Sequence, residues 1–331
     1  MMKIALVCSH GGHLSEMLYL LDAFKGHEIF FITYDNPRTR NLGHRKYLFP
    51  NFGENYFEVI KNLHKIIGIL LKENPDIIVS NGSEIAVPFF YVGKLLRKKL
   101  AFIECYTRIN MPTVTGKLVY PISDLFLVMW PEMLENYGKK AKYFGGLFDI
   151  VKAEKKVETT KNGDNNILVI VGMHYQGFER LVKKMDEIAG KISDKVIMQI
   201  GKTDYEPKNA EYFRFKELDS EIEALMKNAK VVLCQGAMTI IDSLFQGTPV
   251  IAVPRLLKYN EHLNDHQLIF SRKLEFMGLV SVVENIDNLD NILPKFKWND
   301  KTKIITNKHL IEKIKTFIEK CNNDGKMDIQ G

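Results

Sequence analysis

The fold class of the first half of the chain is decided by the stretch KIALVCSHGGHLSEM, residues 3–17. Ile4–Val7 is an apolar run with the length of a buried strand, and Ser9–Gly12 is a loop of small and polar residues. After this loop, apolar side chains between Leu14 and Phe24 recur at the spacing of one helix face. The stretch therefore predicts a strand, a glycine-rich turn and a helix, the opening unit of a parallel α/β sheet.

This pattern continues through the first half and restarts in the second. The restart consists of an apolar run at Ile167–Val171, a turn at Gly172 and apolar positions at helical spacing from Phe178 to Ala189. Other apolar runs of strand length are found at 29–33, 77–80, 196–200, 231–233 and 250–253. Strands that alternate with helical segments predict two α/β halves, each built on a parallel sheet.

The two patterned halves are separated by residues 146–166, which are rich in Lys, Glu, Thr, Asn and Gly. We predict a first domain at 1–148, a linker at 149–165, and a second domain at 166–331 that includes a C-terminal amphipathic helix. A chain of 331 residues suits two domains of ordinary size. Two such halves also predict a ligand cleft between them, because α/β sheets bind ligands beyond the carboxyl ends of their strands.

Composition excludes several classes of protein. The net charge of +6 is too small to indicate a nucleic-acid-binding protein. The four cysteines are scattered and form no C-x-x-C pair, which argues against a disulfide framework and indicates a reducing compartment. No run of 18 apolar residues and no signal-peptide core is present. We therefore expect a cytoplasmic protein that is soluble or peripheral to a membrane.

The first candidate site is the loop Ser9-His10-Gly11-Gly12-His13. Glycines let the backbone approach a ligand, and the start of a helix presents free N–H groups to an anion such as a phosphate. His13 could act as a general base, because imidazole accepts a hydroxyl proton near neutral pH. A tight connection with a backbone-bonded histidine explains the same residues.

The second candidate site is Cys234-Gln235-Gly236-Ala237-Met238-Thr239, where another strand leads into another helix. Thr239 could cap that helix or bind a phosphate. Asp242 follows one turn later, where its carboxylate could accept hydrogen bonds from both ribose hydroxyls of a nucleotide. An ordinary acidic residue in a first helical turn is the alternative for Asp242.

The third candidate site is the polar segment 260–267, which suits the hydroxyl groups of a sugar. Metal binding is the competing interpretation, because His262 and His266 lie four residues apart. However, the pair lacks an E-x-x-H pattern, and the chain contains no D-x-D motif. We therefore expect no metal at this segment.

Two helical segments, at 61–72 and 87–100, combine apolar and basic residues. Each could contact an anionic membrane surface, or could pack in the core with a solvated basic rim. Glu104 and Arg108, four residues apart after a predicted strand, could form an ion pair or line a site for an acceptor.

These motifs together resemble a known family. The first half resembles the membrane-associated subunit of the two-subunit eukaryotic transferase that adds the second GlcNAc to dolichol-pyrophosphate-GlcNAc. It resembles even more the matching half of paired bacterial exopolysaccharide and capsule glycosyltransferases. The resemblance is carried by Gly11–Met17, Asn81–Pro88, Ile103–Cys105, Arg108, Thr115–Lys117 and Trp130–Glu132.

The second half resembles the donor-binding subunit of the same pairs. Its matching segments are Val171–His174, Phe178–Leu181, Gln199–Tyr205, Gly236–Thr239 and Asn264–Gln267. The two halves are fused here in the order that is also found in the bacterial GlcNAc transferase that forms peptidoglycan lipid II.

The resemblance implies an α/β fold of the GT-B type, with two Rossmann-like domains and a cleft between them. It implies an inverting transfer without metal or other cofactor, from a UDP-sugar (GlcNAc, Gal or GlcA) to a polyprenyl-linked sugar acceptor. For this transfer we predict His13 as the catalytic base with Glu104 as the alternative, and an acceptor site that includes Gly11, Gly12, Gly82, Glu84 and Arg108. The implied donor site comprises Gly172, His174, Gly201, Phe215, Gly236, Ala237, Met238, Thr239, Asp242, Glu261, His266 and Gln267.

The sequence departs from the family pattern at four positions near the implied donor site. Cys234 and Gln235 replace a His-Ala pair before Gly236, and Met238 replaces a glycine. Met173 replaces a threonine, so a hydroxyl donor to a phosphate is missing there, although backbone N–H groups remain.

Two other functions fit the same motifs. One is a UDP-sugar epimerase of the same two-domain build, and the other is a non-catalytic subunit that binds a nucleotide sugar. The eukaryotic subunit's N-terminal transmembrane helix has no counterpart here, so we expect a peripheral protein on the cytoplasmic face of the membrane. Both a monomer and a homo-oligomer remain open.

Overall fold

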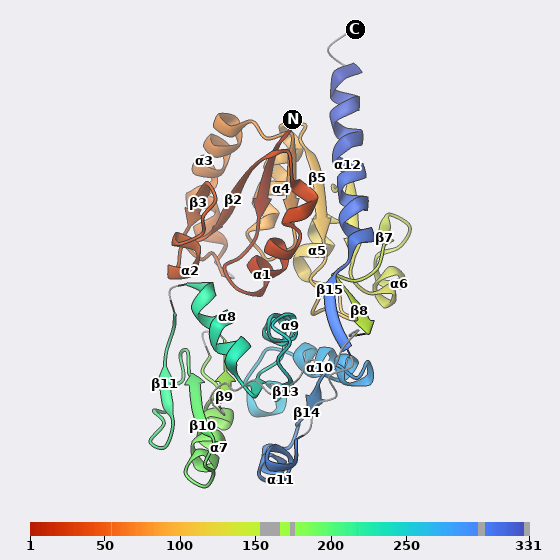
Figure 1. Cartoon of the computed structure of the whole chain (residues 1–331). Helices are drawn as coiled ribbons and strands as arrows, with labels where there is room; N and C mark the ends of the chain where they lie inside the picture. The colour runs from red at the N-terminus through yellow and green to blue at the C-terminus, as the bar shows by residue number, and fades with distance from the viewer. Residues whose placement is uncertain (54, 153–165, 173–175, 217, 297–301, 328–331) are drawn as a thin grey trace. The chain divides into compact units, whose positions relative to one another are not determined.

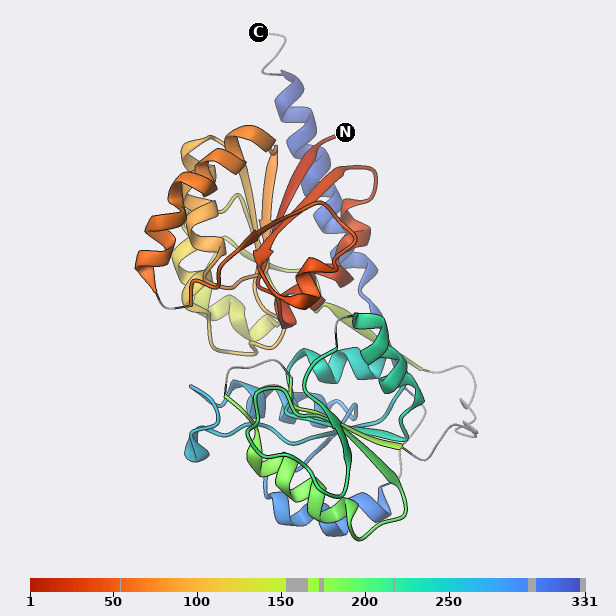
Figure 2. The same cartoon turned by 90° about the vertical axis from the view of Figure 1, so that its left-hand side faces the viewer.

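A computed structural model describes residues 1–53, 55–152, 166–172, 176–216, 218–296 and 302–327 (Figures 1 and 2). The chain forms two compact units. Unit 1 comprises Met1–Asp149 together with Thr306–Gly331, and unit 2 comprises Ile150–Ile305. Each unit is built on its own parallel sheet, as the repeated strand–helix pattern predicts.

The sheet of unit 1 has seven strands in the order β3-β2-β1-β4-β5-β6-β7. Its central strands are buried almost throughout, because helices cover both faces of the parallel sheet (Figure 2). The strands are β1 (Lys3–Val7), β2 (Glu28–Tyr34), β3 (Lys46–Phe49), β4 (Ile77–Ser80), β5 (Lys99–Ile103), β6 (Leu125–Val128) and β7 (Ala141–Tyr143).

Some helices of unit 1 begin or end at residues with identifiable capping roles. Asn55 caps α3 (Tyr56–Glu73) by accepting a hydrogen bond from Phe57 N, and Asn74 ends this helix in the left-handed conformation. The helices are α1 (Gly12–Tyr19), η1 (Leu21–Phe24), α2 (Pro37–Arg40), α3 (Tyr56–Glu73), α4 (Ala86–Leu95), α5 (Val114–Val119), η2 (Pro131–Met133) and α6 (Leu134–Tyr137).

The sheet of unit 2 has six strands in the order β11-β10-β9-β12-β13-β14. The strands are β9 (Asn166–Ile170), β10 (Lys195–Gln199), β11 (Glu211–Phe213), β12 (Val231–Cys234), β13 (Val250–Ala252) and β14 (Ser281–Val282). The helices are α7 (Glu179–Ala189), α8 (Asp219–Asn228), α9 (Met238–Phe245), η3 (Leu257–Tyr259), α10 (His266–Phe276), η4 (Ile286–Asn288), α11 (Leu289–Ile292) and η5 (Leu293–Lys295).

Each sheet has one point at which the strand order reverses. In unit 1 this point lies between β1 and β4, and in unit 2 it lies between β9 and β12. Loops at the carboxyl ends of such strand pairs diverge to opposite sides and leave a crevice that commonly binds ligands. In both units the loops at this point carry the glycine motifs that the sequence singled out: Gly11 and Gly82 in unit 1, and Gly172 and Gly236 in unit 2.

The placement of the C-terminal helix differs from the prediction. The chain passes between the units in β8 (Phe148–Lys152) and β15 (Thr302–Thr306), which pair with each other. Helix α12 (Lys308–Met327) then belongs to unit 1 and packs against η1, rather than against the second domain. Its apolar face, including Leu310, Ile314 and Ile318, is buried as the periodicity predicts. Periodicity identifies such a face but carries no information about the surface that covers it.

None of the helices in the described part of the chain is long and apolar enough to cross a membrane. The predicted linker, apart from the last residues of β8, lies outside the described residues.

Candidate active site

The crevice of unit 1 is lined by the loops after β1 and β4. Gly11 and Gly12 follow β1 and start α1, so that His13 is the second residue of this helix. Gly82 follows β4 with a φ of +110°, a conformation that L side chains rarely adopt. A Cβ atom on Gly82 would lie 2.8 Å from Cε1 of His13. The imidazole therefore rests directly on the Gly82 backbone, and only glycine leaves room for it.

The loop that carries His13 is held by side chains from two other elements. Arg38, in α2, donates hydrogen bonds to the Gly11 carbonyl at 3.0 Å and to Ser15 Oγ at 3.0 Å. Asn81 Nδ2 donates to the His13 carbonyl at 2.7 Å. Sequence analysis did not identify Arg38, because no motif connects the short α2 segment with the β1 loop.

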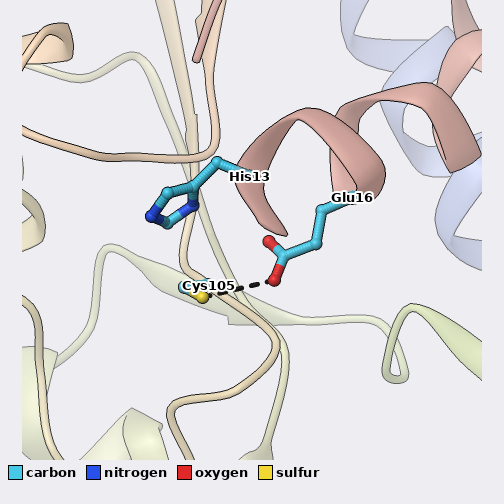
Figure 3. A group of neighbouring side chains, drawn as sticks. All are labelled: His13, Glu16 and Cys105. Atoms are coloured by element: carbon cyan, nitrogen blue, oxygen red, sulfur yellow. Dashed lines mark hydrogen bonds between the residues drawn. The ribbon is translucent and has the colours of Figure 1, made fainter. Parts of the chain in front are cut away.

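Two buried groups lie beneath the His13 side chain (Figure 3). Ligand atoms of His13, Glu16 and Cys105 all lie within 4.8 Å of one another. The Cys105 thiol donates to Glu16 Oε1 at 3.2 Å, and Tyr106 N donates to the same oxygen at 3.2 Å. His13 Nδ1 is buried and has no hydrogen-bond partner among the described residues.

A histidine, a carboxylate and a thiol are also a set of ligands that zinc accepts. Burial, however, raises the pKa of the Glu16 carboxyl well above its ordinary value and also raises the pKa of the Cys105 thiol. A metal ion would have to displace both protons, which weakens binding at neutral pH. We therefore interpret the group as a hydrogen-bonded cluster beneath His13, and the absence of metal remains a prediction.

Replacing Glu16 tests the protonated state of this cluster. A carboxyl with a raised pKa stabilises the fold below its ordinary pKa of 4.5, and this contribution is lost as pH rises through the raised value. Relative to Glu16→Gln, which cannot ionise, the wild type should lose free energy of unfolding as pH rises from the ordinary carboxyl pKa through the raised value. Urea unfolding of both proteins across this range measures the difference, and a difference that does not change with pH would contradict the assignment.

Glu104, the alternative base, has a structural role. Its Oε2 accepts hydrogen bonds from Thr113 N at 3.3 Å, from Thr113 Oγ1 at 3.1 Å and from the Tyr137 hydroxyl, and Oε1 accepts from Cys105 N at 3.0 Å. Because Glu104 is buried and accepts four hydrogen bonds, it anchors the start of α5. Within the described residues no ion pair connects it to the half-buried Arg108.

Glu84, a predicted acceptor residue, lies near the same crevice. Its Oε1 accepts a hydrogen bond from the Tyr34 hydroxyl at 2.7 Å, and Glu84 is half-buried. Burial and the adjacent carboxylate both raise the pKa of Tyr34. Of the predicted residues in unit 1, the structure thus gathers His13, Gly82 and the Gly11–Gly12 loop at one strand edge.

The crevice of unit 2 is lined by glycines with positive φ. Gly172, after β9, has a φ of +74° and exchanges hydrogen bonds of 2.9 Å and 3.1 Å with the Gln199 side chain. Gly201, after β10, has a φ of +54°, and a Cβ atom there would lie 2.6 Å from the Gly172 carbonyl oxygen. These two predicted donor residues therefore pack backbone to backbone at the carboxyl edge of the sheet.

Helix α9 begins at the other side of this crevice. Gly236 has a φ of +112°, and Ala237 has a φ of +58° that is unusual for a residue with a side chain. Met238 is the first helical residue, so Ala237 is the N-cap, and no side chain caps the first turn. Thr239 is therefore not the cap that the sequence suggested. The N–H groups of the first turn are the natural partners of an anion.

Two further predicted residues lie next to the α9 loop. Asp242 is half-buried one turn into α9. Gln267, at the start of α10, places its Cβ 3.5 Å from where a Cβ of Gly236 would lie. His266 is held by Asn264, with 2.6 Å between His266 Nδ1 and Asn264 Oδ1. The segment predicted to bind sugar thus reaches the α9 loop at Gln267.

Of the remaining predicted donor residues, Glu261 lies at a second depression on unit 2. Glu261 accepts hydrogen bonds from Arg180 Nε at 2.8 Å and Arg180 Nη2 at 2.9 Å. This pair helps to line a cavity of about 520 Å³ together with Tyr259 and Lys202. Phe215 is 40% exposed with the Lys202 ammonium 5.7 Å from its ring centroid. His174 lies outside the described residues.

Two family models match the chain in succession. Residues 37–147 match the family described as oligosaccharide biosynthesis protein Alg14 like. Residues 166–321 match the C-terminal domain of glycosyltransferase family 28. The boundary between the two matches falls in the predicted linker.

Curated relatives match the same regions. The chain is 26% identical over 180 residues to UDP-N-acetylglucosamine transferase subunit ALG14 of Saccharomyces cerevisiae, which covers 44% of this chain and 76% of the yeast protein. Matches to the ALG14 subunits of several other fungi span less than half of those proteins.

A longer match is found in Clostridium perfringens. The chain is 26% identical over 259 residues to UDP-N-acetylglucosamine--N-acetylmuramyl-(pentapeptide) pyrophosphoryl-undecaprenol N-acetylglucosamine transferase, which covers 75% of this chain and 71% of the relative. Among solved structures, the UDP-GlcNAc 2-epimerase of Methanocaldococcus jannaschii superposes with a TM-score of 0.67. At 15% identity over 97% of this chain and 100% of the epimerase, this likeness shows the shared fold alone.

The fold prediction and the family resemblance are therefore both confirmed. The chain is a glycosyltransferase that joins an Alg14-like amino-terminal domain to a family 28 glycosyltransferase C-terminal domain.

Proposed function

We propose that this protein transfers a sugar from a UDP-sugar, with UDP-GlcNAc as the first candidate, to a sugar carried on polyprenyl (pyro)phosphate, with inversion at the anomeric carbon. The carrying observation is the uncapped first turn of α9 behind Gly236, which suits a diphosphate. Two relatives support the substrates. Both are named as UDP-N-acetylglucosamine or N-acetylglucosamine transferases, and the clostridial name includes a pyrophosphoryl-undecaprenol acceptor.

In the proposed reaction, an acceptor hydroxyl oxygen forms a bond to C1 of the donor sugar while the bond from C1 to the UDP oxygen breaks. The electron pair of the broken bond stays on UDP, where the N–H groups of α9 stabilise the charge. The hydroxyl proton passes to His13, whose imidazole lies against Gly82 in the crevice of unit 1. The donor is assigned to unit 2 and the proton acceptor to unit 1.

A panel of nucleotides tests the donor assignment first. A ligand at about 100 times its Kd stabilises the native state by about 2.7 kcal/mol, which thermal unfolding detects readily. We expect stabilisation by UDP and by at least one UDP-sugar, and transfer of that sugar to a polyprenyl-pyrophosphate-linked acceptor. No stabilisation by any uridine nucleotide would contradict the proposal. Conversion of UDP-GlcNAc in the absence of acceptor would instead indicate an epimerase.

The acceptor is anchored in a membrane, and unit 1 carries a surface suited to one. Helix α4 packs against both α3 and α5, so the three helices form a continuous surface. We define the α3–α5 face by its exposed apolar residues, which are Phe57, Ile60, Leu63, Ile67, Leu71, Tyr91, Leu95, Val114 and Leu118. Lys61, Lys72, Lys94, Arg97 and Lys117 are exposed on the same helices or directly after them. Apolar side chains surrounded by cations suit an anionic lipid surface.

An acidic side chain introduced on the α3–α5 face should reduce binding to an anionic membrane. Leu95 is 83% exposed, so Leu95→Glu should leave the fold intact and weaken binding to phosphatidylglycerol-containing vesicles by roughly 10–100-fold. Phe276→Glu is the matched control, because Phe276 is 90% exposed on α10 of unit 2. Sedimentation with vesicles measures both variants. If both variants lose vesicle binding equally, or if Leu95→Glu loses none, the α3–α5 face does not bind the membrane.

A further inference from the structure

Arg255 is a buried cation with too few partners. It follows β13 at the carboxyl edge of the sheet of unit 2, and its residue is only 1% exposed. Arg255 Nη2 donates a hydrogen bond to the Val171 carbonyl at 3.0 Å. Its Nε and Nη1 have no hydrogen-bond partner among the described residues. Burying a charge with so little compensation is costly, and such a group is retained where a ligand supplies the missing partner.

The surroundings of Arg255 carry an excess of positive charge. The guanidinium carbons of Arg255 and Arg180 lie 5.2 Å and 5.3 Å from the centroid of the Phe178 ring. Glu261 is the carboxylate of this group, and its oxygens are already occupied by Arg180 and by Leu256 N. Two guanidinium groups therefore share one carboxylate, which neutralises only one of them.

The Arg255 side chain stays protonated although it is buried. Desolvation lowers the pKa of its guanidinium to about 10, against an opposing effect from Glu261. This value remains well above neutral pH, so the side chain carries its charge under ordinary conditions.

Arg255 is also connected to both loops of the unit 2 crevice. Val171, which accepts its hydrogen bond, directly precedes Gly172. Arg255 N donates to Gln267 Oε1 at 3.2 Å, and Gln267 packs against Gly236. The guanidinium, whose Nε and Nη1 have no partner in the described part of the chain, is thus fixed at the strand edge from which both glycine loops leave.

We propose that Arg255 binds the diphosphate of the nucleotide-sugar donor and supplies the positive charge of a site without a metal ion. This inference rests on the proposed function and extends it to a residue outside the predicted donor set. When the bond from C1 to the diphosphate oxygen breaks, that oxygen keeps the electron pair, and Arg255 stabilises the charge while keeping its own proton. The guanidinium of Arg255 also supplies a hydrogen-bond donor to the phosphate in place of the threonine hydroxyl that is missing because residue 173 is a methionine.

The test compares Arg255→Met and Arg255→Lys with the wild type by calorimetric titration with UDP, UMP and uridine. Arg255→Met should weaken UDP binding by at least about 10-fold and leave uridine binding within about 2-fold, with Arg255→Lys in between. Without nucleotide, the melting temperature of Arg255→Met should be equal to or above that of the wild type, because an unpaired buried charge has been removed. Arg272→Met, on the exposed side of α10, is the matched control and should bind all three ligands normally.

Several outcomes would overturn this assignment. Unchanged UDP affinity in Arg255→Met excludes the contact, and a lower melting temperature with equal losses for UDP and uridine indicates a purely structural arginine. A defect seen with UDP-glucuronate but not with UDP-glucose would show that the cation reads a sugar carboxylate instead of the diphosphate. If the wild type fails to bind UDP, the proposed function itself is contradicted. If the wild type and Arg255→Met bind UDP equally well, only the role of Arg255 is contradicted.

Discussion

His13→Ala is expected to lower turnover by ~10²–10⁴-fold while the affinity for UDP stays unchanged. The imidazole is the proposed acceptor of the hydroxyl proton, and it lies in unit 1, whereas the diphosphate is assigned to α9 of unit 2. Transfer at saturating UDP-sugar measures the first quantity, and calorimetric titration with UDP measures the second. His309→Ala, an exposed histidine on α12 of the same unit, is the control. Full activity of His13→Ala would remove this residue from the role.

Gly82→Ala is expected to displace the His13 imidazole without changing His13 itself. The Cβ atom of Gly82→Ala would lie 2.8 Å from His13 Cε1, at a φ that disfavours alanine, so the ring must move. Gly82→Ala should therefore lower turnover with unchanged UDP affinity, as His13→Ala does. The double variant should be no slower than His13→Ala alone, since both changes act through one group.

Asp242→Asn is expected to weaken UDP binding by roughly 100-fold. The carboxylate lies one turn into α9, beyond the turn assigned to the diphosphate, and we propose that it accepts hydrogen bonds from the ribose hydroxyls. Hydrogen bonds to a charged group contribute about 1.5–3 kcal/mol each, which corresponds to a factor of about 10–150. Asp290→Asn, an exposed carboxylate on α11, should bind UDP as the wild type does.

Comparing UDP with 2′-deoxy-UDP in the wild type and in Asp242→Asn distinguishes a loss of ribose binding from a general disturbance of α9. The wild type should bind 2′-deoxy-UDP less tightly than UDP, and Asp242→Asn should discriminate less between the two nucleotides. If Asp242→Asn keeps the full preference for UDP over its deoxy analogue, Asp242 does not bind the ribose.

The architecture of each unit could be predicted from the sequence because it depends on local patterns. Apolar runs of four or five residues, followed by glycines and by apolar positions at helical spacing, specify strand, loop and helix in turn. The glycine motifs also located the two points at which the strand order reverses, since the carboxyl ends of parallel strands meet at one edge of the sheet. The restart of the pattern at Ile167 separated the two sheets.

Long-range packing was not predictable in the same way. Helix α12 has a clear apolar face, but the helix belongs to unit 1 and packs against η1, which lies near the other end of the sequence. Glu104 belongs to a family motif and was predicted as the alternative base, an ion-pair partner or an acceptor-site residue, and none of these predictions included the four hydrogen bonds by which it anchors α5. A motif indicates that a residue matters, and only its neighbours show whether the reason is packing or reaction.

Two features of the sites were missed for a similar reason. Cys105 and Glu16 lie 89 residues apart in sequence, yet their side chains share a hydrogen bond beneath His13. Arg255 follows a strand as an ordinary cation would, and its special character is the absence of partners for Nε and Nη1 among the described residues. Burial without compensation is a property of the folded state, and no residue pattern encodes it.

The most direct measurement is a crystal structure of this protein with UDP. The uracil nucleotide should lie in unit 2, with its diphosphate at the first turn of α9 behind Gly236 and its ribose hydroxyls within hydrogen-bonding distance of Asp242. Electron density for UDP at any other place on the protein, with the α9 turn unoccupied, would contradict the account of how this chain binds its donor.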